Sequence, residues 1–333
     1  MRSLVDKICK QLVKRENISE VVSYNFSKET MKRGQQFLII VKPECLMINE
    51  GVDTEQILTK LFERFKQNYV YINSVLLVNG CFLKQDNLVE QQYGMLNKWA
   101  KTSFEQIPRN YQNIIKSRYD DRNIIGSFNF LDTHSEISVK ELEILSHKKG
   151  SDKVGNGIYI FPYEVDGERY GIINAFHPHQ IEYLSQDNNY LLLLNCSSVT
   201  DYVRLADELI GFYVPEFAQK ESMRNFIHEN RNLNIPNVST FYNGFHISPS
   251  PLEGMFGIIR YWLRNEKLAD AVKKTTLGVN LLEAGMGIDE IIKMRENPII
   301  FETNSTLFDM VEGKNMDYVI NYVLENRNKF LYC

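Results

Sequence analysis

The sequence has few cysteines and no long apolar run, and each absence excludes a class of protein. Five cysteines are scattered through 333 residues without a C-x-x-C pair: Cys9, Cys45, Cys81, Cys196 and Cys333. An odd, scattered set argues against a disulfide framework and against a structural zinc site. No apolar run approaches the ~20 residues that a membrane span needs. We therefore expect reduced thiols in a soluble, cytoplasmic protein without a membrane partner.

An excess of one charge is also missing. The chain carries 38 Lys and Arg against 42 Asp and Glu, a net charge of −4, which gives no overall attraction to nucleic acid or to anionic membranes. Residues 1–17 interrupt each short apolar run with a charge, so a signal peptide is not expected there. With 44% apolar residues, the chain has material for one enlarged domain or two ordinary ones.

Hydrophobic periodicity predicts a chain of mixed helices and strands. Apolar residues at helical spacing predict helices at 3–16, 54–66, 87–99, 254–263, 266–284, 288–295 and 317–326. Apolar or alternating runs predict strands at 37–41, 69–78, 190–195 and 240–245. The turn signal Asp166-Gly167 predicts a β-hairpin. We expect Ser198 or Thr200 to cap a helix, residues 105–150 to be irregular and part helical, and residues 225–239 to form an enlarged loop.

Two polar side chains follow predicted strands and are candidates for chemistry. His246 lies in the stretch Asn243 to Ser250, which is rich in hydroxyls and prolines. An imidazole with an unperturbed pKa near ~6.5 is largely neutral at pH 7 and accepts a phosphoryl group without a separate base. Lys42 stands where a proline ends the strand at 37–41. The alternatives are an incidental histidine in a turn and a lysine that caps a sheet edge.

Around these two residues the sequence resembles nucleoside diphosphate kinases. The stretch from Asn243 to Ser250 is similar to the family signature N-x-x-H-G-S-D-S, with Ile247 and Pro249 in place of the Gly and the Asp. A Trp follows, as in the family, with one residue inserted. Lys42-Pro-Glu is similar to the family's K-P-D, where the lysine contacts the transferred phosphate.

A third stretch carries the same resemblance. Gly211 to Arg224 aligns without gaps to the family pattern G-x-T-x-P-x-x-A-x-x-G-S-I-R, with Tyr213 in place of Thr and Glu221 in place of Gly. Arg224 then matches the arginine that clamps the nucleotide phosphates, and a guanidinium fork suits that task. Tyr93 matches an H-Y-x-x-L spacing beside the nucleotide, although plain packing is its alternative.

The resemblance implies an α+β fold, the ferredoxin-like βαββαβ sandwich of nucleoside diphosphate kinases. That domain would span residues 36–264, with an inserted β-hairpin region at about 105–189. An N-terminal helical extension at 1–35 and a helical C-terminal extension at 265–333 lie outside it. The family is usually hexameric, so a homo-oligomer is a further expectation.

The resemblance also implies an activity and its participants. ATP with Mg²⁺ would transfer its γ-phosphate to His246, and the phosphohistidine would pass it to a nucleoside diphosphate or a similar phosphorylated acceptor. Lys42 and Arg224 would stabilise the transferred group, and Asn243 and Ser248 would set the hydrogen bonds around His246. Tyr93, Tyr213 and Arg204 are candidate nucleotide contacts, with Trp99 or Phe104 stacking the base.

Several departures from the family pattern leave alternatives open. The carboxylate that orients the family's histidine would stand at Gly257, so Glu253 is either its replacement or a helix N-terminal charge. A family arginine is Asp207 here, so Arg204 either substitutes for it or lies on the surface. One alternative for the whole protein is a non-catalytic nucleotide-binding or scaffold module. Another is a metal-dependent hydrolase using His177, His179 and His246, although for His177-Pro-His179 we favour a structural turn and expect no metal site.

Overall fold

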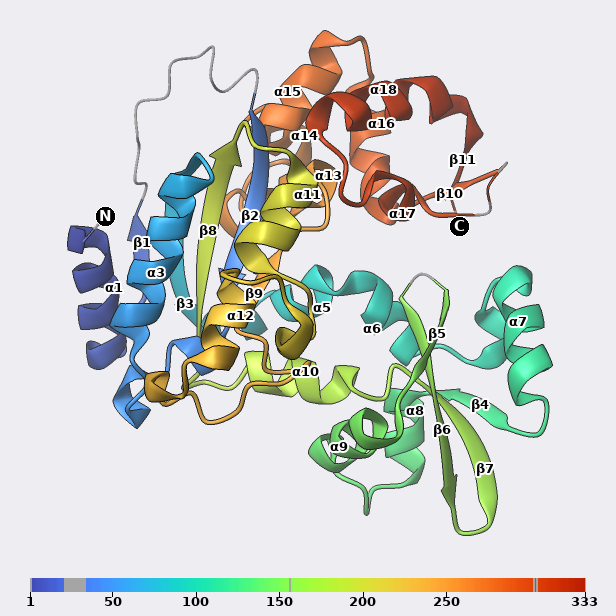
Figure 1. The fold of residues 1–333 in the computed structure, drawn as a ribbon. Helices are drawn as coiled ribbons and strands as arrows, with labels where there is room; N and C mark the ends of the chain where they lie inside the picture. Colours follow the sequence, from blue (N-terminus) through green and yellow to red (C-terminus); the bar gives the residue numbers. More distant parts are fainter. Residues whose placement is uncertain (1, 21–33, 156, 302, 304, 333) are drawn as a thin grey trace. The chain divides into compact units, whose positions relative to one another are not determined.

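The computed structural model describes residues 2–20, 34–155, 157–301, 303 and 305–332, so residues 21–33 of the expected N-terminal extension lie outside the described residues. The chain has mixed α/β structure with several sheets and many helices (Figure 1). It divides into two compact units, residues 1–80 with 187–333 and residues 81–186. The second unit therefore starts at Cys81, well before the insertion expected from about residue 105, and the C-terminal helices belong to the first unit.

A five-stranded sheet forms the centre of the first unit. Its strands are β1 (Ile18–Glu20), β2 (Gln35–Val41), β3 (Val70–Asn79), β8 (Tyr190–Ser198) and β9 (Phe245–Ile247). They lie in the order β1-β3-β8-β2-β9, and each neighbouring pair is antiparallel. All seven residues of β2 are buried, as its continuous apolar run predicts. The chain leaves this sheet for the second unit and returns to it at neighbouring positions, because Asn79 at the end of β3 pairs with Tyr190 at the start of β8.

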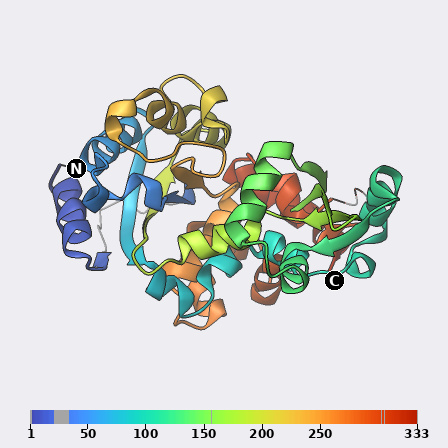
Figure 2. The same cartoon turned by 90° about the horizontal axis from the view of Figure 1, so that it is seen from below.

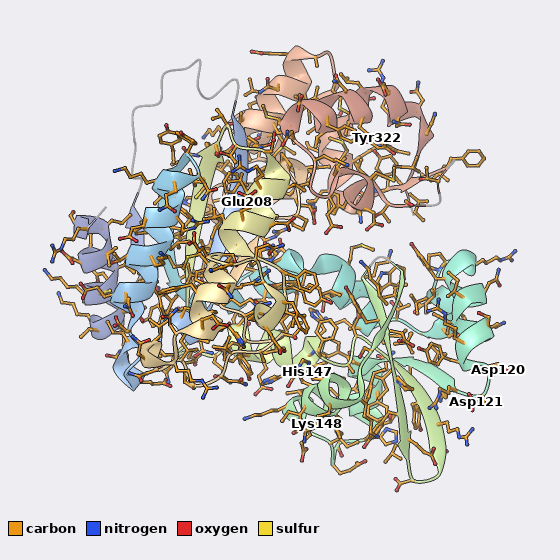
Figure 3. The ribbon with its side chains drawn as sticks, in the orientation of Figure 1. Asp120, Asp121, His147, Lys148, Glu208 and Tyr322 are labelled. Atoms are coloured by element: carbon orange, nitrogen blue, oxygen red, sulfur yellow. The ribbon has the colours of Figure 1, made fainter. Side chains whose placement is uncertain are left out.

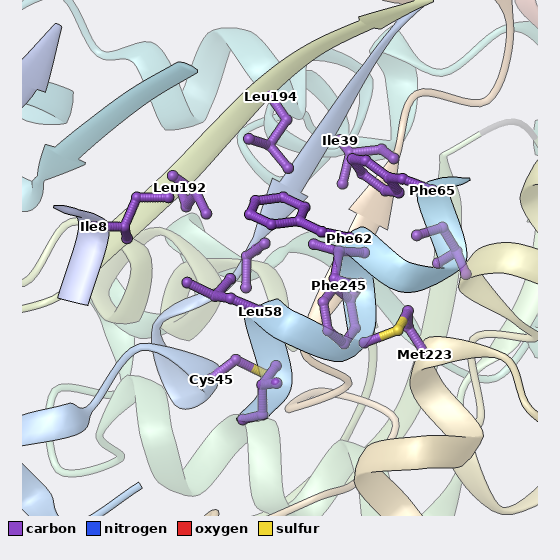
Figure 4. Packing of buried hydrophobic residues seen from close by; sticks show 14 of the residues in the cluster. Ile8, Ile39, Cys45, Leu58, Phe62, Phe65, Leu192, Leu194, Met223 and Phe245 are labelled. Atoms are coloured by element: carbon purple, nitrogen blue, oxygen red, sulfur yellow. The ribbon is translucent and has the colours of Figure 1, made fainter. Parts of the chain in front are cut away.

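One face of the sheet is covered by α1 (Arg2–Lys14) and α3 (Thr54–Gln67), and the other by α13 (Pro251–Trp262) and α15 (Thr276–Glu283) (Figures 1 and 2). Asp53 caps α3 by accepting a hydrogen bond from the backbone of Gln56. The aromatic rings of α3 fill the core beneath it, among side chains from β2, β8 and β9: Phe62, Phe65, Ile39, Leu194 and Phe245 (Figure 4).

On the opposite face, α13 packs very close to β2. Ser250 caps the helix by accepting a hydrogen bond from the backbone of Glu253. A Cβ at Gly254 would lie 2.9 Å from Phe37 Cα, and a Cβ at Gly257 would lie 2.9 Å from Leu38 Cδ2. Glycine at both positions therefore lets the helix axis approach the strand.

The C-terminal helices pack against α13 in a second apolar core. The expected helix at 266–284 is two helices, because Thr275 caps α15 and separates it from the helix before it. The remaining elements here are α14 (Leu268–Val272), α16 (Ile288–Lys293), α17 (Leu307–Val311), α18 (Met316–Asn326) and the strand pair β10 (Ile299–Ile300) and β11 (Phe330–Leu331).

The segment between β8 and α13 differs most from expectation. The helix after β8 begins beyond Asp201, as α11 (Tyr202–Arg204), and continues as the π-helical segment η4 (Leu205–Ile210). The expected loop at 225–239 contains α12 (Met223–Glu229) and a 3-10 turn, η6 (Arg231–Leu233). The last strand is β9 rather than residues 240–245, because the hydrogen bonds that define it are those to β2. His246 therefore lies within a strand and not in a turn.

The second unit has its own four-stranded sheet in the order β4-β7-β6-β5. The predicted hairpin is present, with Asp166 and Gly167 at its turn. Its strands are β4 (Asn123–Gly126), β5 (Asp152–Gly155), β6 (Ile158–Val165) and β7 (Glu168–Ile173). The region expected to be irregular is largely helical, and the expected helix at 87–99 is interrupted at Tyr93. The helices are α4 (Gly80–Lys84), α5 (Leu88–Gln92), α6 (Gly94–Ala100), α7 (Arg109–Tyr119), α8 (Ser127–Thr133), α9 (Val139–Lys149) and α10 (His177–Leu184).

Candidate functional site

His246 points toward the face of the sheet that α13 covers. In β9 it pairs directly with Ile40 of β2, and directly opposed residues of an antiparallel pair project from the same face. Its neighbours Phe245 and Ile247 pack on the other face, in the core under α3. His246 as a whole is partly buried.

Lys42 stands at the end of β2, one strand away from His246. Its Nζ donates hydrogen bonds to Asn243 Oδ1 at 2.7 Å and to the carbonyl of Phe241 at 3.2 Å. Only 9% of the residue is exposed. Burial lowers the pKa of Lys42 to about 8, against the opposing effect of nearby Glu44, and Arg224 lowers it further. The lysine is therefore still mostly charged at pH 7.

Arg224 is fixed beside His246 by two backbone carbonyls. Its Nη1 donates to Gly211 O at 2.7 Å, and its Nη2 donates to Phe245 O at 2.6 Å. Gly211 has φ +100°, and a Cβ there would lie 2.3 Å from Ser222 Oγ. The spacing from Gly211 to Ser222 to Arg224 thus has a physical reason. The missing side chain of Gly211 leaves space for Ser222, which caps α12, and the Gly211 carbonyl accepts a hydrogen bond from the Arg224 guanidinium.

Asn243 joins three segments of the site. Its Nδ2 donates to Tyr213 O at 3.1 Å and to Thr240 O at 3.0 Å, while its Oδ1 accepts from Lys42. These bonds fix the turn that leads into β9. The asparagine therefore positions Lys42 and the loop of Tyr213.

Ser248 and Glu253 form hydrogen bonds around the end of β9 and the start of α13. Ser248 is buried, and its Oγ accepts from the backbone of Leu38 and bonds with Tyr202 Oη, so it anchors the end of β9. Glu253 accepts from Ser250 Oγ at 3.3 Å. Burial raises the pKa of Glu253 to about 8, and Glu312 adds to the rise. The carboxyl group of Glu253 is thus bonded to Ser250, the N-cap residue of α13.

Burial and three nearby cations shift the pKa of His246. Burial lowers the pKa of His246 to about 3, and Lys42, Arg224 and Arg260 lower it further. The ring is therefore neutral at pH 7 and carries a lone pair on one nitrogen. Arg260, on α13, was missed by the sequence reasoning. The available signal was an arginine on the otherwise apolar helix that follows the histidine.

Other predicted contacts lie elsewhere. Arg204 is on the surface, where its Nη2 is 3.0 Å from Oε2 of Glu208, the residue labelled in Figure 3. Tyr93 belongs to the second unit, where its ring meets that of His177. Trp99 is 4% exposed in that unit's core and cannot stack a base there. Tyr213 is 55% exposed, and its carbonyl, rather than its ring, contacts Asn243.

The histidine pair of the second unit belongs to a helix. His177 and His179 begin helix α10 instead of forming a turn, and His177 Nδ1 lies 3.1 Å from Gln180 Oε1. Among the described residues, no group of three or more His, Cys, Asp or Glu is arranged to hold a metal ion. Nor does any helix in the described ranges have the length and apolarity to cross a membrane.

Comparison with known proteins gives little. No family model matches the chain, and no curated protein matches it. A crystal structure of an NDP kinase from Pyrobaculum aerophilum aligns with 69% of this chain and 96% of that chain, at 14% sequence identity and a TM-score of 0.33. A likeness of this strength does not establish a family.

Proposed function

We propose that this chain is a nucleotide-dependent phosphotransferase in which His246 carries the phosphoryl group. The observation that supports it most is a neutral imidazole on which both Lys42 and Arg224 act, in a residue that is only partly buried. A neutral ring is the nucleophilic form, and fixed cations stabilise the charge of a transferring phosphoryl group. The strand order β9-β2-β8-β3, with α3 joining β2 to β3, also supports a ferredoxin-like sandwich.

The reaction would run in two displacements. A lone pair of His246 attacks the γ-phosphorus of ATP, the bond to the bridging oxygen breaks, and its electron pair leaves with ADP. An acceptor nucleoside diphosphate then takes the phosphoryl group by the reverse path. Lys42 and Arg224 hold positive charge where the phosphoryl oxygens would lie. Mg²⁺ would arrive with the phosphates of ATP, which suits an ion that keeps several waters and needs few protein carboxylates.

Exposed aromatic side chains beside the site support a nucleotide as the substrate. Phe212 and Tyr213 have ring centroids 4.4 Å apart and follow the glycine that receives Arg224. Their loop is tied to Lys42 through Asn243. A base stacked on these rings would be held without strong base selectivity, because every base has a π-face. These rings replace Trp99 and Phe104 as the proposed stacking platform.

Incubation with γ-labelled ATP tests the proposal. The wild-type protein should gain an acid-labile, alkali-stable label that is lost in His246→Ala and retained in the matched control His228→Ala. Chasing with a nucleoside diphosphate should remove the label and yield labelled triphosphate. An unlabelled wild-type protein that still binds ATP would instead support a non-catalytic nucleotide-binding module.

A further inference from the structure

The register of α13 on β2 brings Arg260 to the level of His246. Gly254 lies over Phe37, and Gly257, one turn later, lies over Leu38. Arg260 follows three residues after Gly257, one turn further along, and residues three apart are neighbours on a helix surface. The strand meanwhile advances toward Ile40, the residue paired with His246. The helix therefore places a guanidinium on the face from which the imidazole projects.

The same packing opposes a carboxylate in this position. The family whose motif this stretch resembles orients its histidine with a carboxylate eleven residues on, and that position is Gly257 here. Any side chain at 257 would begin 2.9 Å from Leu38 Cδ2, so it would have to displace a fully buried leucine. One turn later the chain has an arginine. From α13, Arg260 lowers the pKa of His246, as a cation near the ring does.

We propose that Arg260 is the third cation of the site and binds the phosphoryl group while His246 carries it. This inference rests on the proposed function. A guanidinium has planar donors that fit phosphate oxygens. Three cations around one dianionic phosphoryl group would make the loaded histidine electrostatically favourable, whereas a protonated imidazole would be unfavourable there.

The charge balance has a chemical consequence. When a neutral ring is phosphorylated, one N–P bond forms, the bond from the γ-phosphorus to the bridging oxygen breaks, and the electron pair leaves with ADP. The second ring nitrogen still holds its proton at that moment. Because Lys42, Arg224 and Arg260 all disfavour a charged ring, the ring gives this proton to water. Each phosphorylation should therefore release one proton, leaving a neutral ring that bears the phosphoryl dianion.

Arg260→Gln tests the assignment, with Lys273→Gln as the matched control. Lys273 is exposed and pairs with Asp270, so its loss removes one charge from the surface. Inorganic pyrophosphate, measured by calorimetry, probes anion binding without any turnover. We expect Arg260→Gln to weaken pyrophosphate binding at least tenfold and to shift the NMR-detected titration of His246 to higher pH. Lys273→Gln should change neither.

The outcomes separate this inference from the proposed function. The wild type could take no label while its pyrophosphate binding and its His246 titration both depend on Arg260. That result would support Arg260 as the third cation and refute the phosphotransferase activity. If the wild type is labelled while Arg260→Gln matches it in both measurements, the assignment of Arg260 is overturned. Should the Gln variant not fold, Arg260→Met, which keeps the apolar stem, takes its place. Proton release upon labelling needs no variant, and a count near zero per phosphohistidine would also overturn the inference.

Discussion

The rate of phosphohistidine formation should be insensitive to acid across a range in which an ordinary histidine loses its activity. An unperturbed imidazole with a pKa of ~6.5 is only ~3% neutral at pH 5. His246, with its pKa lowered to about 3, remains almost entirely neutral there. The two cases differ by ~30-fold in the fraction of reactive ring at pH 5.

The alkaline side should instead be governed by Lys42. Its pKa is lowered to about 8, so its charge is present below that pH and is lost as the pH rises through it. Between pH 7 and pH 9 the charged fraction falls by ~10-fold, and the labelling rate should fall with it. Lys42→Arg retains its charge over this range, so it should remove the alkaline decline even if its rate is lower throughout.

The assay is the initial rate of label incorporation from γ-labelled ATP, measured from pH 5 to pH 9. An NMR titration of His246 without nucleotide separates the ring from ionisations of the substrate. A ring that titrates near pH 6.5, together with a labelling rate that declines with the same midpoint, would refute the electrostatic reasoning. A wild-type rate that stays constant up to pH 9 would refute the role given to Lys42.

Three further predictions concern packing, the base and the buried acid. Gly254→Ala places a Cβ 2.9 Å from the backbone of Phe37, so the cost of overpacking outweighs the gain in helix propensity. Urea titration should show a net loss of about 1–2 kcal/mol in the free energy of unfolding. Gly94→Ala, with open space around it, should show no loss. Tyr213→Ala should weaken ATP binding by roughly 5–100-fold, the range expected for one stacked base. Calorimetry should show unchanged pyrophosphate binding, and equal losses of affinity for both ligands would contradict stacking. Because the pKa of Glu253 is raised to about 8, its folded form keeps a proton that the unfolded form loses, so stability should decline from pH 4.5 to pH 8. Glu253→Gln should reduce that decline in denaturant titrations at the two pH values, and an identical decline would contradict it.

Local sequence patterns were sufficient to predict a helix or strand where that element buries a single apolar stripe. The run at 37–41, the stripe at 54–66 and the hairpin at Asp166 all formed as predicted, because burial and turn geometry there depend on neighbours in sequence. The last strand was misplaced because its extent depends on hydrogen bonds to β2, about two hundred residues away in sequence.

Site chemistry was harder to predict than the elements. The sequence indicated His246, Lys42 and Arg224, but whether they share a site depends on sheet order and on bonds to backbone carbonyls. Glu253 was assigned by its distance along the chain, whereas the contact of its carboxyl group is with Ser250 and its pKa is raised by burial and by Glu312. The rotation of α13 places Arg260 near the ring, and it is set by the close contacts of glycines with β2, which no periodicity reveals.

Asn79 at the end of β3 pairs with Tyr190 at the start of β8, so the chain leaves the sheet for the second unit and returns to it at neighbouring positions. The two connections of this unit leave from facing ends of neighbouring antiparallel strands, so a tight turn in its place would keep β3 and β8 continuous as an ordinary hairpin. The unit can then be gained, lost or exchanged without disturbing the strand order that holds His246. A shortened chain with such a turn offers a direct way to separate the chemistry of the sheet from whatever residues 81–186 contribute.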